Sequence, residues 1–132
     1  MQTFSFICLV ALSLLIACEV ASDPNIFRYE KEHSFGLYEE YRSIDGVVKL
    51  TIDSLRDSRC PQNVECIWQG EISVNISVSI DQAYQLELHS VTHSKDTLQN
   101  YEFELIGADP YPVYPEEIKD EDYQVRLKVS RL

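Results

Sequence analysis

Among the residues that could do chemistry, the cysteines come first. The chain of 132 residues holds four of them, Cys8, Cys18, Cys60 and Cys66. Five residues separate Cys60 from Cys66, and in an oxidising compartment such a pair most simply forms a disulfide. A ring of this size stabilises a folded chain by about 2 kcal/mol. No second pair of Cys or His has the spacing to complete a tetrahedral zinc site with these two cysteines.

Cys18 follows an apolar run, Phe4 to Ala17, that has the length of a signal-peptide core. The run is too short for a permanent transmembrane helix of about 20 residues. It ends in Leu15-Ile16-Ala17-Cys18, which resembles the bacterial lipobox, where the cysteine is lipidated and becomes the mature N-terminus. We therefore expect residues 1–17 to be a lipoprotein signal peptide and Cys18 to carry lipid. The alternative is ordinary secretion, with Cys18 incidental.

The histidines and the acidic cluster are weak metal candidates. His89 and His93 lie four residues apart, which in an extended strand is roughly 13 Å, too far to share an ion unless the chain turns sharply. An acidic run lacks the Asp-x-Asp-x-Asp-Gly order of a known calcium loop, and we interpret it as a solvated charge run. Its members are Glu116, Glu117, Asp120, Glu121 and Asp122. We expect no metal and no cofactor.

Enzyme chemistry and nucleic-acid binding are both disfavoured. The sequence has no Gly-x-Ser-x-Gly elbow and no phosphate-cradling glycine loop. The pair of cysteines in the mature chain is expected to be oxidised. With 22 acidic and 11 basic side chains, the formal net charge of −11 repels nucleic acid and anionic headgroups. The sequence predicts a protein without catalytic activity.

The elements that must position these residues are strands. Apolar and polar residues alternate along six runs, and this period of two indicates half-buried strands. The runs are 34–41, 47–55, 71–80, 83–90, 101–105 and 123–129, and the third and fourth are expected to form a hairpin. The fold class is all-β: a small antiparallel β-sandwich or barrel of about six strands with one disulfide. A short helical turn is an option around 115–120.

The domain is expected to span residues 34–132, with residues 18–33 as a tether from the lipid. The tether is polar, contains Pro24 and shows no sustained period. The alternative is a docked arm, with Ile26, Phe27 and Tyr29 lying on the core.

The longest alternation runs from Cys66 to Ile80. Val74, Ile76 and Val78 are expected inside, and Ser73, Asn75 and Ser77 at the solvent or a rim. The same parity predicts that Cys66 and Trp68 also face inward.

Two segments could contact a partner. In the structural interpretation the Cys60–Cys66 ring only pins its loop, and Arg59 pairs with Asp57. In the functional one the ring preorganises a recognition loop from which Arg59, Gln62 and Asn63 project. The second segment carries Tyr111 and Tyr114 among prolines, either as a lid over a sheet edge or as an exposed aromatic patch.

The block Asp57-Ser58-Arg59-Cys60-Pro61, followed by Cys66-x-Trp68-x-Gly70, resembles a group of small, mostly uncharacterised bacterial lipoproteins. This resemblance implies an envelope location and a β-rich fold, and it implies no chemistry. We expect a lipid-anchored binding or interaction module of the cell envelope, with the outer membrane favoured because Glu19 follows Cys18. Its partners would be the membrane and an unidentified envelope protein or ligand. The alternatives are an inhibitor of an extracytoplasmic hydrolase that acts through the Cys60–Cys66 loop, and a small metal- or ligand-sequestering lipoprotein.

Overall fold

The structure, a computed structural model, describes residues 23–132. The predicted signal peptide and Cys18 lie outside the described residues. The described chain is all-β, as predicted, and its only helical element is the 3-10 turn η1 (Asp120–Asp122), which begins at the last residue of the range 115–120. Between residues 23 and 132, no helix is long and apolar enough to cross a membrane.

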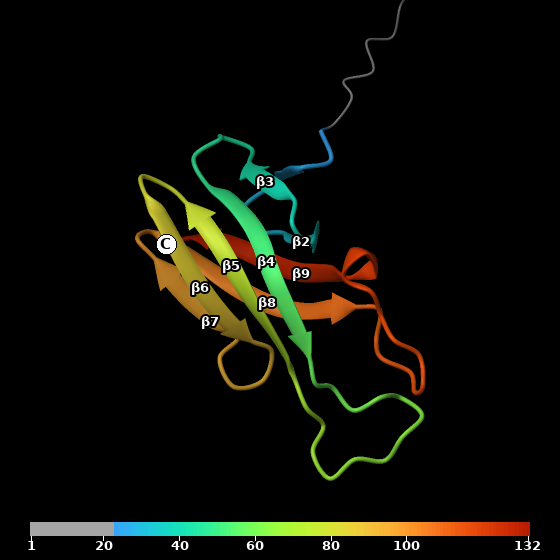
Figure 1. Ribbon diagram of the computed structural model, residues 1–132. Coiled ribbons are helices and arrows are strands. Elements are labelled where there is room, and N and C mark those ends of the chain that lie inside the picture. Colours follow the sequence, from blue (N-terminus) through green and yellow to red (C-terminus); the bar gives the residue numbers. More distant parts are fainter. Residues whose placement is uncertain (1–22) are drawn as a thin grey trace, which may run out of the picture.

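The described residues form nine strands in two sheets. The strands are β1 (Ile26–Phe27), β2 (Glu32–Gly36), β3 (Glu40–Ser43), β4 (Lys49–Asp57), β5 (Ile72–Ser79), β6 (Ala83–His89), β7 (Lys95–Leu98), β8 (Tyr101–Asp109) and β9 (Gln124–Arg131). One sheet has the order β1-β3-β4-β5-β6 and the other β2-β9-β8-β7. Figure 1 shows the two sheets stacked on each other. The fold is therefore a sandwich rather than a closed barrel, with more strands than the six expected.

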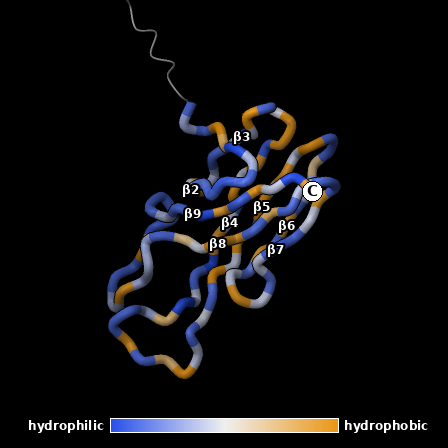
Figure 2. The backbone as a smooth tube through the Cα atoms, turned by 180° about the vertical axis from the view of Figure 1, so that it is seen from behind, coloured by the Kyte–Doolittle hydropathy of each residue, from blue (hydrophilic) through white to orange (hydrophobic). Residues whose placement is uncertain are grey.

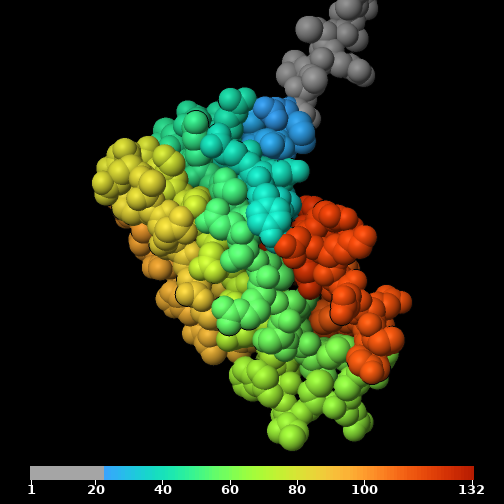
Figure 3. Space-filling view, viewed as in Figure 1, coloured from blue at the N-terminus to red at the C-terminus, as the bar shows by residue number. Residues whose placement is uncertain are grey.

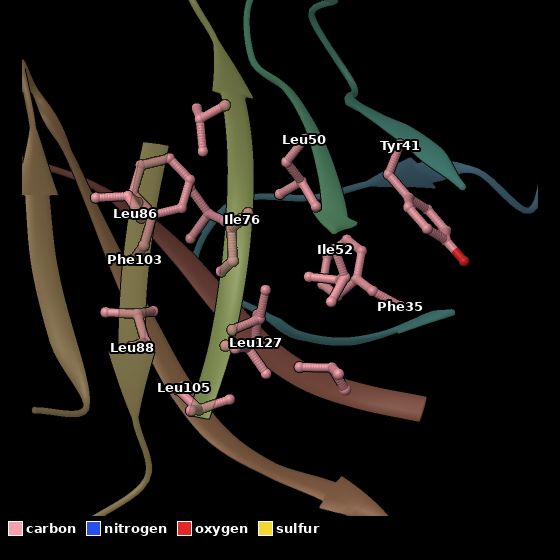
Figure 4. Close-up of a cluster of buried hydrophobic side chains, with 14 of the residues drawn as sticks. Phe35, Tyr41, Leu50, Ile52, Ile76, Leu86, Leu88, Phe103, Leu105 and Leu127 are labelled. Atoms are coloured by element: carbon pink, nitrogen blue, oxygen red, sulfur yellow. The ribbon is translucent and has the colours of Figure 1, made fainter. Parts of the chain in front are cut away.

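The core lies between the sheets and is built by the predicted alternation. Along β5, Val74, Ile76 and Val78 are buried, and Ile76 lies opposite Ile52 of β4 and Leu86 of β6. Figure 2 shows hydrophobic and hydrophilic residues alternating along the strands, and Figure 4 shows the apolar side chains that meet between the sheets. This interior is the largest source of stability in the domain.

The polar face of β5 is less exposed than predicted. Asn75 and Ser77 are half-buried because their side chains hydrogen-bond to β4, Asn75 to Ser54 and Ser77 to Asp53. Ser73 is buried rather than facing solvent. A register shift in β4 between Ile52 and Ser54 brings these partners to the face of β5.

The predicted hairpin is confirmed, because β5 and β6 pair antiparallel up to Ser79 and Ala83. The run 34–41, however, is two strands in different sheets. Phe35 pairs with Val125 of β9, whereas Tyr41 pairs with Leu50 of β4. The chain changes sheet at Tyr38, whose backbone has a φ of 66°.

The docked-arm alternative describes residues 25–33 better than a tether. Phe27 is fully buried and packs edge-on against Phe35 at 5.7 Å between ring centroids. Tyr29 stacks on Tyr101 of β8 at 5.6 Å. The domain therefore begins near Asn25, whose carbonyl oxygen accepts a hydrogen bond from the backbone N–H of Arg42.

Candidate functional site

The Cys60–Cys66 disulfide is present, as predicted, in the loop that joins β4 to β5. Between the disulfide and the strands, the two arms of the loop, residues 58–60 and 69–71, are hydrogen-bonded to each other. The backbone N–H of Cys60 donates to the carbonyl of Gln69 at 2.8 Å, and that of Ser58 donates to the carbonyl of Glu71 at 2.9 Å. The loop is thus closed twice, once by the covalent bond and once by its own backbone.

Gly70 makes this closure possible. It is buried and has a φ of +68°, a backbone conformation that side chains with a Cβ rarely adopt. A Cβ at this position would lie 1.8 Å from the carbonyl oxygen of Ser58, which is on the opposite arm. Only glycine allows the two arms to approach so closely.

The same glycine explains why the prediction for Cys66 and Trp68 was wrong. Both residues are exposed, and Trp68 has 58% of its surface open to solvent. The alternation that fixes the inner face of β5 begins at Ile72, beyond the left-handed turn at Gly70. The odd or even position of a residue before such a turn does not predict which face of the strand its side chain lies on. The backbone at the turn lacks the extended geometry that the period of two requires.

Arg59 does not project to solvent, because its guanidinium fastens the loop to the other sheet. Its side chain is only 10% exposed and forms an ion pair with Asp57, to which Nε donates at 2.8 Å. Nη1 donates to the carbonyl of Ala108 at 2.7 Å, and Nη2 donates to that of Pro110 at 3.0 Å. The guanidinium also lies over the ring of Tyr111, 4.6 Å from its centroid.

We call Arg59, together with its contacts to Asp57 and to the carbonyl groups of Ala108 and Pro110, the Arg59 clamp. The Asp57 carboxylate at its centre is held ionised. Burial alone would raise its pKa, but the hydrogen bonds and the charge of Arg59 outweigh burial, and the pKa is lowered. The Tyr123 hydroxyl donates to Asp57 Oδ2 at 3.0 Å. Burial, followed by the charge of Asp57, raises the pKa of Tyr123 to about 12, so this hydroxyl keeps its proton at neutral pH.

Asn63 holds the tyrosine and proline segment, residues 110–115, against the disulfide loop. Its amide donates to the carbonyl of Tyr114 at 2.7 Å and accepts from the backbone N–H of the same residue at 2.9 Å. The N–H of Gln62 donates to the carbonyl of Pro112 at 3.0 Å. Of the five predicted contact residues, Arg59 and Asn63 thus use their side chains to hold the two segments together, and all five except Arg59 are exposed.

We call the exposed apolar and aromatic side chains of these two segments the end surface. They are Val64, Ile67, Trp68, Tyr111 and Tyr114. Ile67 is fully exposed, and Tyr114 is 65% exposed. In Figure 3 the light green loop and the orange-red segment adjoin at the lower end of the molecule. Tyr111 and Tyr114 are thus exposed on a segment that Asn63 holds against the disulfide loop.

Sequence reasoning missed the exposure of Val64, Ile67 and Trp68. Ile67 and Trp68 are adjacent and both apolar or large, and adjacent residues of a strand point to opposite faces, so both cannot face the core. Together with the following glycine, that conflict was the available sign that the strand pattern had not yet begun.

A pocket of about 210 Å³ lies beside the clamp, smaller than the roughly 300–1,000 Å³ of most small-molecule sites. It is lined by Arg59, Ile72, Ser90, Ile106, Gly107, Ala108, Asp109, Tyr111 and Arg126. Both of its arginines already face carboxylates: Arg59 pairs with Asp57, and Arg126 pairs with Glu32 and Asp109. These cations are therefore neutralised within the protein.

The chain turns sharply after His89, so that His89 and His93 pair through their backbones. The side chain of His89 contacts Glu71 at 3.5 Å, and that of His93 contacts Asp96 at 3.7 Å. Among residues 23–132 no group of three or more acidic, histidine or cysteine side chains is placed to hold a metal ion. The acidic residues from Glu116 to Asp122 are exposed, and one of them, Asp120, accepts a hydrogen bond from Tyr38.

No protein-family model matches this chain, and no curated protein or solved structure is significantly similar to it.

Proposed function

We propose that this protein is a lipid-anchored binding module of the bacterial cell envelope, without catalytic activity, whose end surface binds another envelope protein. The observation that carries the proposal is the exposure of Ile67 and Trp68 on a loop that the fold holds rigidly. Apolar residues of this size normally contribute to a core. Here they point away from it, and the loop is fixed by a disulfide and by the Arg59 clamp.

The composition of the end surface suits a protein partner. Tryptophan and tyrosine are over-represented among the residues that dominate the binding energy of protein interfaces. A preorganised loop also loses little conformational entropy when it binds. The small pocket beside Arg59 makes a small-molecule ligand less suitable, since its arginines are already paired.

The position of the chain's beginning supports an anchored orientation. In Figure 1 the first described residues, coloured blue, lie at the end of the sandwich opposite the disulfide loop. A lipid on Cys18 would place the membrane at that end. The end surface would then face away from the bilayer, where a partner can reach it.

Replacing Trp68 by alanine should weaken partner capture roughly tenfold or more, as expected for a central interface aromatic. The melting temperature should change little, because Trp68 is largely exposed. The measurement is cross-linking and recovery of the partner from intact envelopes, compared with a Val91→Ala control, an exposed apolar site outside the end surface. Undiminished capture by both Trp68→Ala and Ile67→Ser variants would contradict the assignment.

Anchoring is tested separately at Cys18. Cys18→Ala should abolish labelling by a fatty-acid analogue and release the domain from the membrane fraction. Because Glu19 follows the cysteine, we expect the lipidated form in the outer membrane. Unchanged membrane partition of the Cys18→Ala chain would show that Cys18 is not the anchor.

A second candidate function, inhibition of an extracytoplasmic hydrolase, is favoured by the shape of the same loop. Figure 1 shows the loop extending beyond the ends of β4 and β5, as a segment that enters a cleft would. Saturable loss of activity of an envelope protease or lysozyme on adding the protein would support inhibition over scaffolding.

A further inference from the structure

A second exposed apolar feature lies at the other end of the sandwich, in the turn between β3 and β4. We call residues 44–47 the β3–β4 tip. Ile44 and Val47 flank Asp45 and Gly46, and they are 55% and 43% exposed. Figure 1 shows this turn at the end where the described chain begins, and Figure 2 shows hydrophobic colour there.

The tip is hydrogen-bonded to the first described residues. The N–H of Ile44 donates to the carbonyl of Phe27 at 2.9 Å. Two residues earlier, Arg42 forms an ion pair with Asp23 at 3.0 Å. The beginning of the folded domain and the β3–β4 tip are therefore parts of one surface.

Little chain separates this surface from Cys18. Because residues 25–33 are docked on the core, only residues 19–22 lie between Cys18 and Asp23. Five extended steps span at most about 17 Å. The polar headgroup layer is itself roughly 5–8 Å thick on each side of the bilayer. A lipid at Cys18 therefore holds the tip within reach of the headgroups.

The charges around the tip are compensated, unlike those of the chain as a whole. The charged side chains of β3 and of the tip, and Lys49 at the start of β4, each pair with an opposite charge: Arg42 with Asp23, Lys49 with Glu40, and Arg131 with Asp45. Asp45 also accepts hydrogen bonds from Tyr29, Ser43 and the N–H of Val47. Paired charges of this kind can approach a low-dielectric layer at lower cost than free ones.

We propose that the β3–β4 tip is a membrane-contact site, in which Ile44 and Val47 insert into the headgroup region of a zwitterionic bilayer. This inference rests on the proposed lipid anchor at Cys18. The lipid and the tip together form a two-point attachment, which fixes the long axis of the sandwich relative to the membrane. The end surface is thereby held away from the bilayer.

The test uses the chain's single tryptophan. Trp68 is replaced by phenylalanine, and a new tryptophan is introduced either as Ile44→Trp or, as a matched control, as Val91→Trp. Val91 is also exposed, and it follows Ser90, which bonds to Ile72 at the disulfide-loop end. The lipidated chain purified from membranes is placed in phosphatidylcholine vesicles that contain brominated acyl chains. If Cys18 proves to be unlipidated, the chain from residue 18 is coupled through the Cys18 thiol to a maleimide lipid.

Tryptophan at position 44 should lose most of its fluorescence to the brominated lipid and shift its emission to the blue, whereas tryptophan at 91 should keep the emission it has in plain vesicles. Equal emission at the two positions in membrane-bound protein would overturn the membrane-contact site and leave the anchor intact. Absence of natural lipid on Cys18 would overturn the anchor, and the maleimide-coupled sample would still decide the contact site.

Discussion

Replacing Ile76 by alanine should destabilise the folded domain by roughly 2–5 kcal/mol. Ile76 is fully buried at the centre of β5, between Ile52 and Leu86 on the neighbouring strands and opposite the other sheet. Truncation removes the burial of its side chain and leaves a cavity that close-packed neighbours fill only in part. The measurement is the free energy of unfolding from urea denaturation, and its dependence on urea concentration (the m-value) should stay unchanged.

Two serines on the same strand serve as controls. Ser79→Ala should change stability by less than about 0.5 kcal/mol, since Ser79 is exposed. Ser77→Ala should cost about 1 kcal/mol, because the Ser77 hydroxyl donates to Asp53 and accepts from Gln85. A loss at Ser79 as large as that at Ile76 would mean that β5 is buried on both faces.

The strands that could be predicted are those whose own sequences alternate. The strands β4, β5, β6, β8 and β9 each bury alternate residues, and the period of two located them. The strand β7, Lys-Asp-Thr-Leu, has no such pattern. It is a strand because it pairs with β8, where Lys95 contacts Glu102 and Glu104. The partner is the next strand of a hairpin, and such pairing requires no apolar alternation in the sequence of β7 itself.

The candidate site was predictable only where it depends on local chemistry. The Cys60–Cys66 bond closes a short ring, and the spacing of the cysteines indicated it. The role of Arg59 depends on carbonyl groups of Ala108 and Pro110, which lie 49 and 51 residues further along the chain. An arginine beside a disulfide looks the same in sequence whether it faces solvent or a distant backbone segment.

Replacing Arg59 by alanine should destabilise the domain by about 3–5 kcal/mol at neutral pH, more than the roughly 2 kcal/mol expected for replacing both Cys60 and Cys66 by serine. The Arg59 variant leaves the buried Asp57 carboxylate without its cation, and the carbonyl groups of Ala108 and Pro110 lose their donor. The double-cysteine variant keeps the Arg59 clamp and the Asn63 contacts, so it should stay folded and melt earlier.

Two variants separate the clamp from a general effect of losing positive charge. Arg56→Ala removes an exposed arginine from β4 and should change stability by at most about 0.5 kcal/mol. Arg59→Lys keeps the charge but cannot reproduce the fork that contacts Asp57 and two carbonyls at once, so its cost should be intermediate. Equal effects of Arg56→Ala and Arg59→Ala would mean that Arg59 is not a structural clamp.

The pH dependence gives the clamp a signature that a simple packing defect lacks. In the wild-type domain the pKa of Asp57 is lowered, so the stability it contributes is present above its unfolded pKa of about 3.9 and is lost as the pH falls through the folded value. Without Arg59, burial raises the pKa of Asp57 relative to the wild type. Protonation of Asp57 at low pH then reduces the stability of the variant less than it reduces that of the wild type. The difference in unfolding free energy between wild type and Arg59→Ala should therefore be largest near pH 7 and shrink below pH of about 4. A difference that stays constant with pH would assign the loss to packing of the Arg59 side chain rather than to its charge on Asp57.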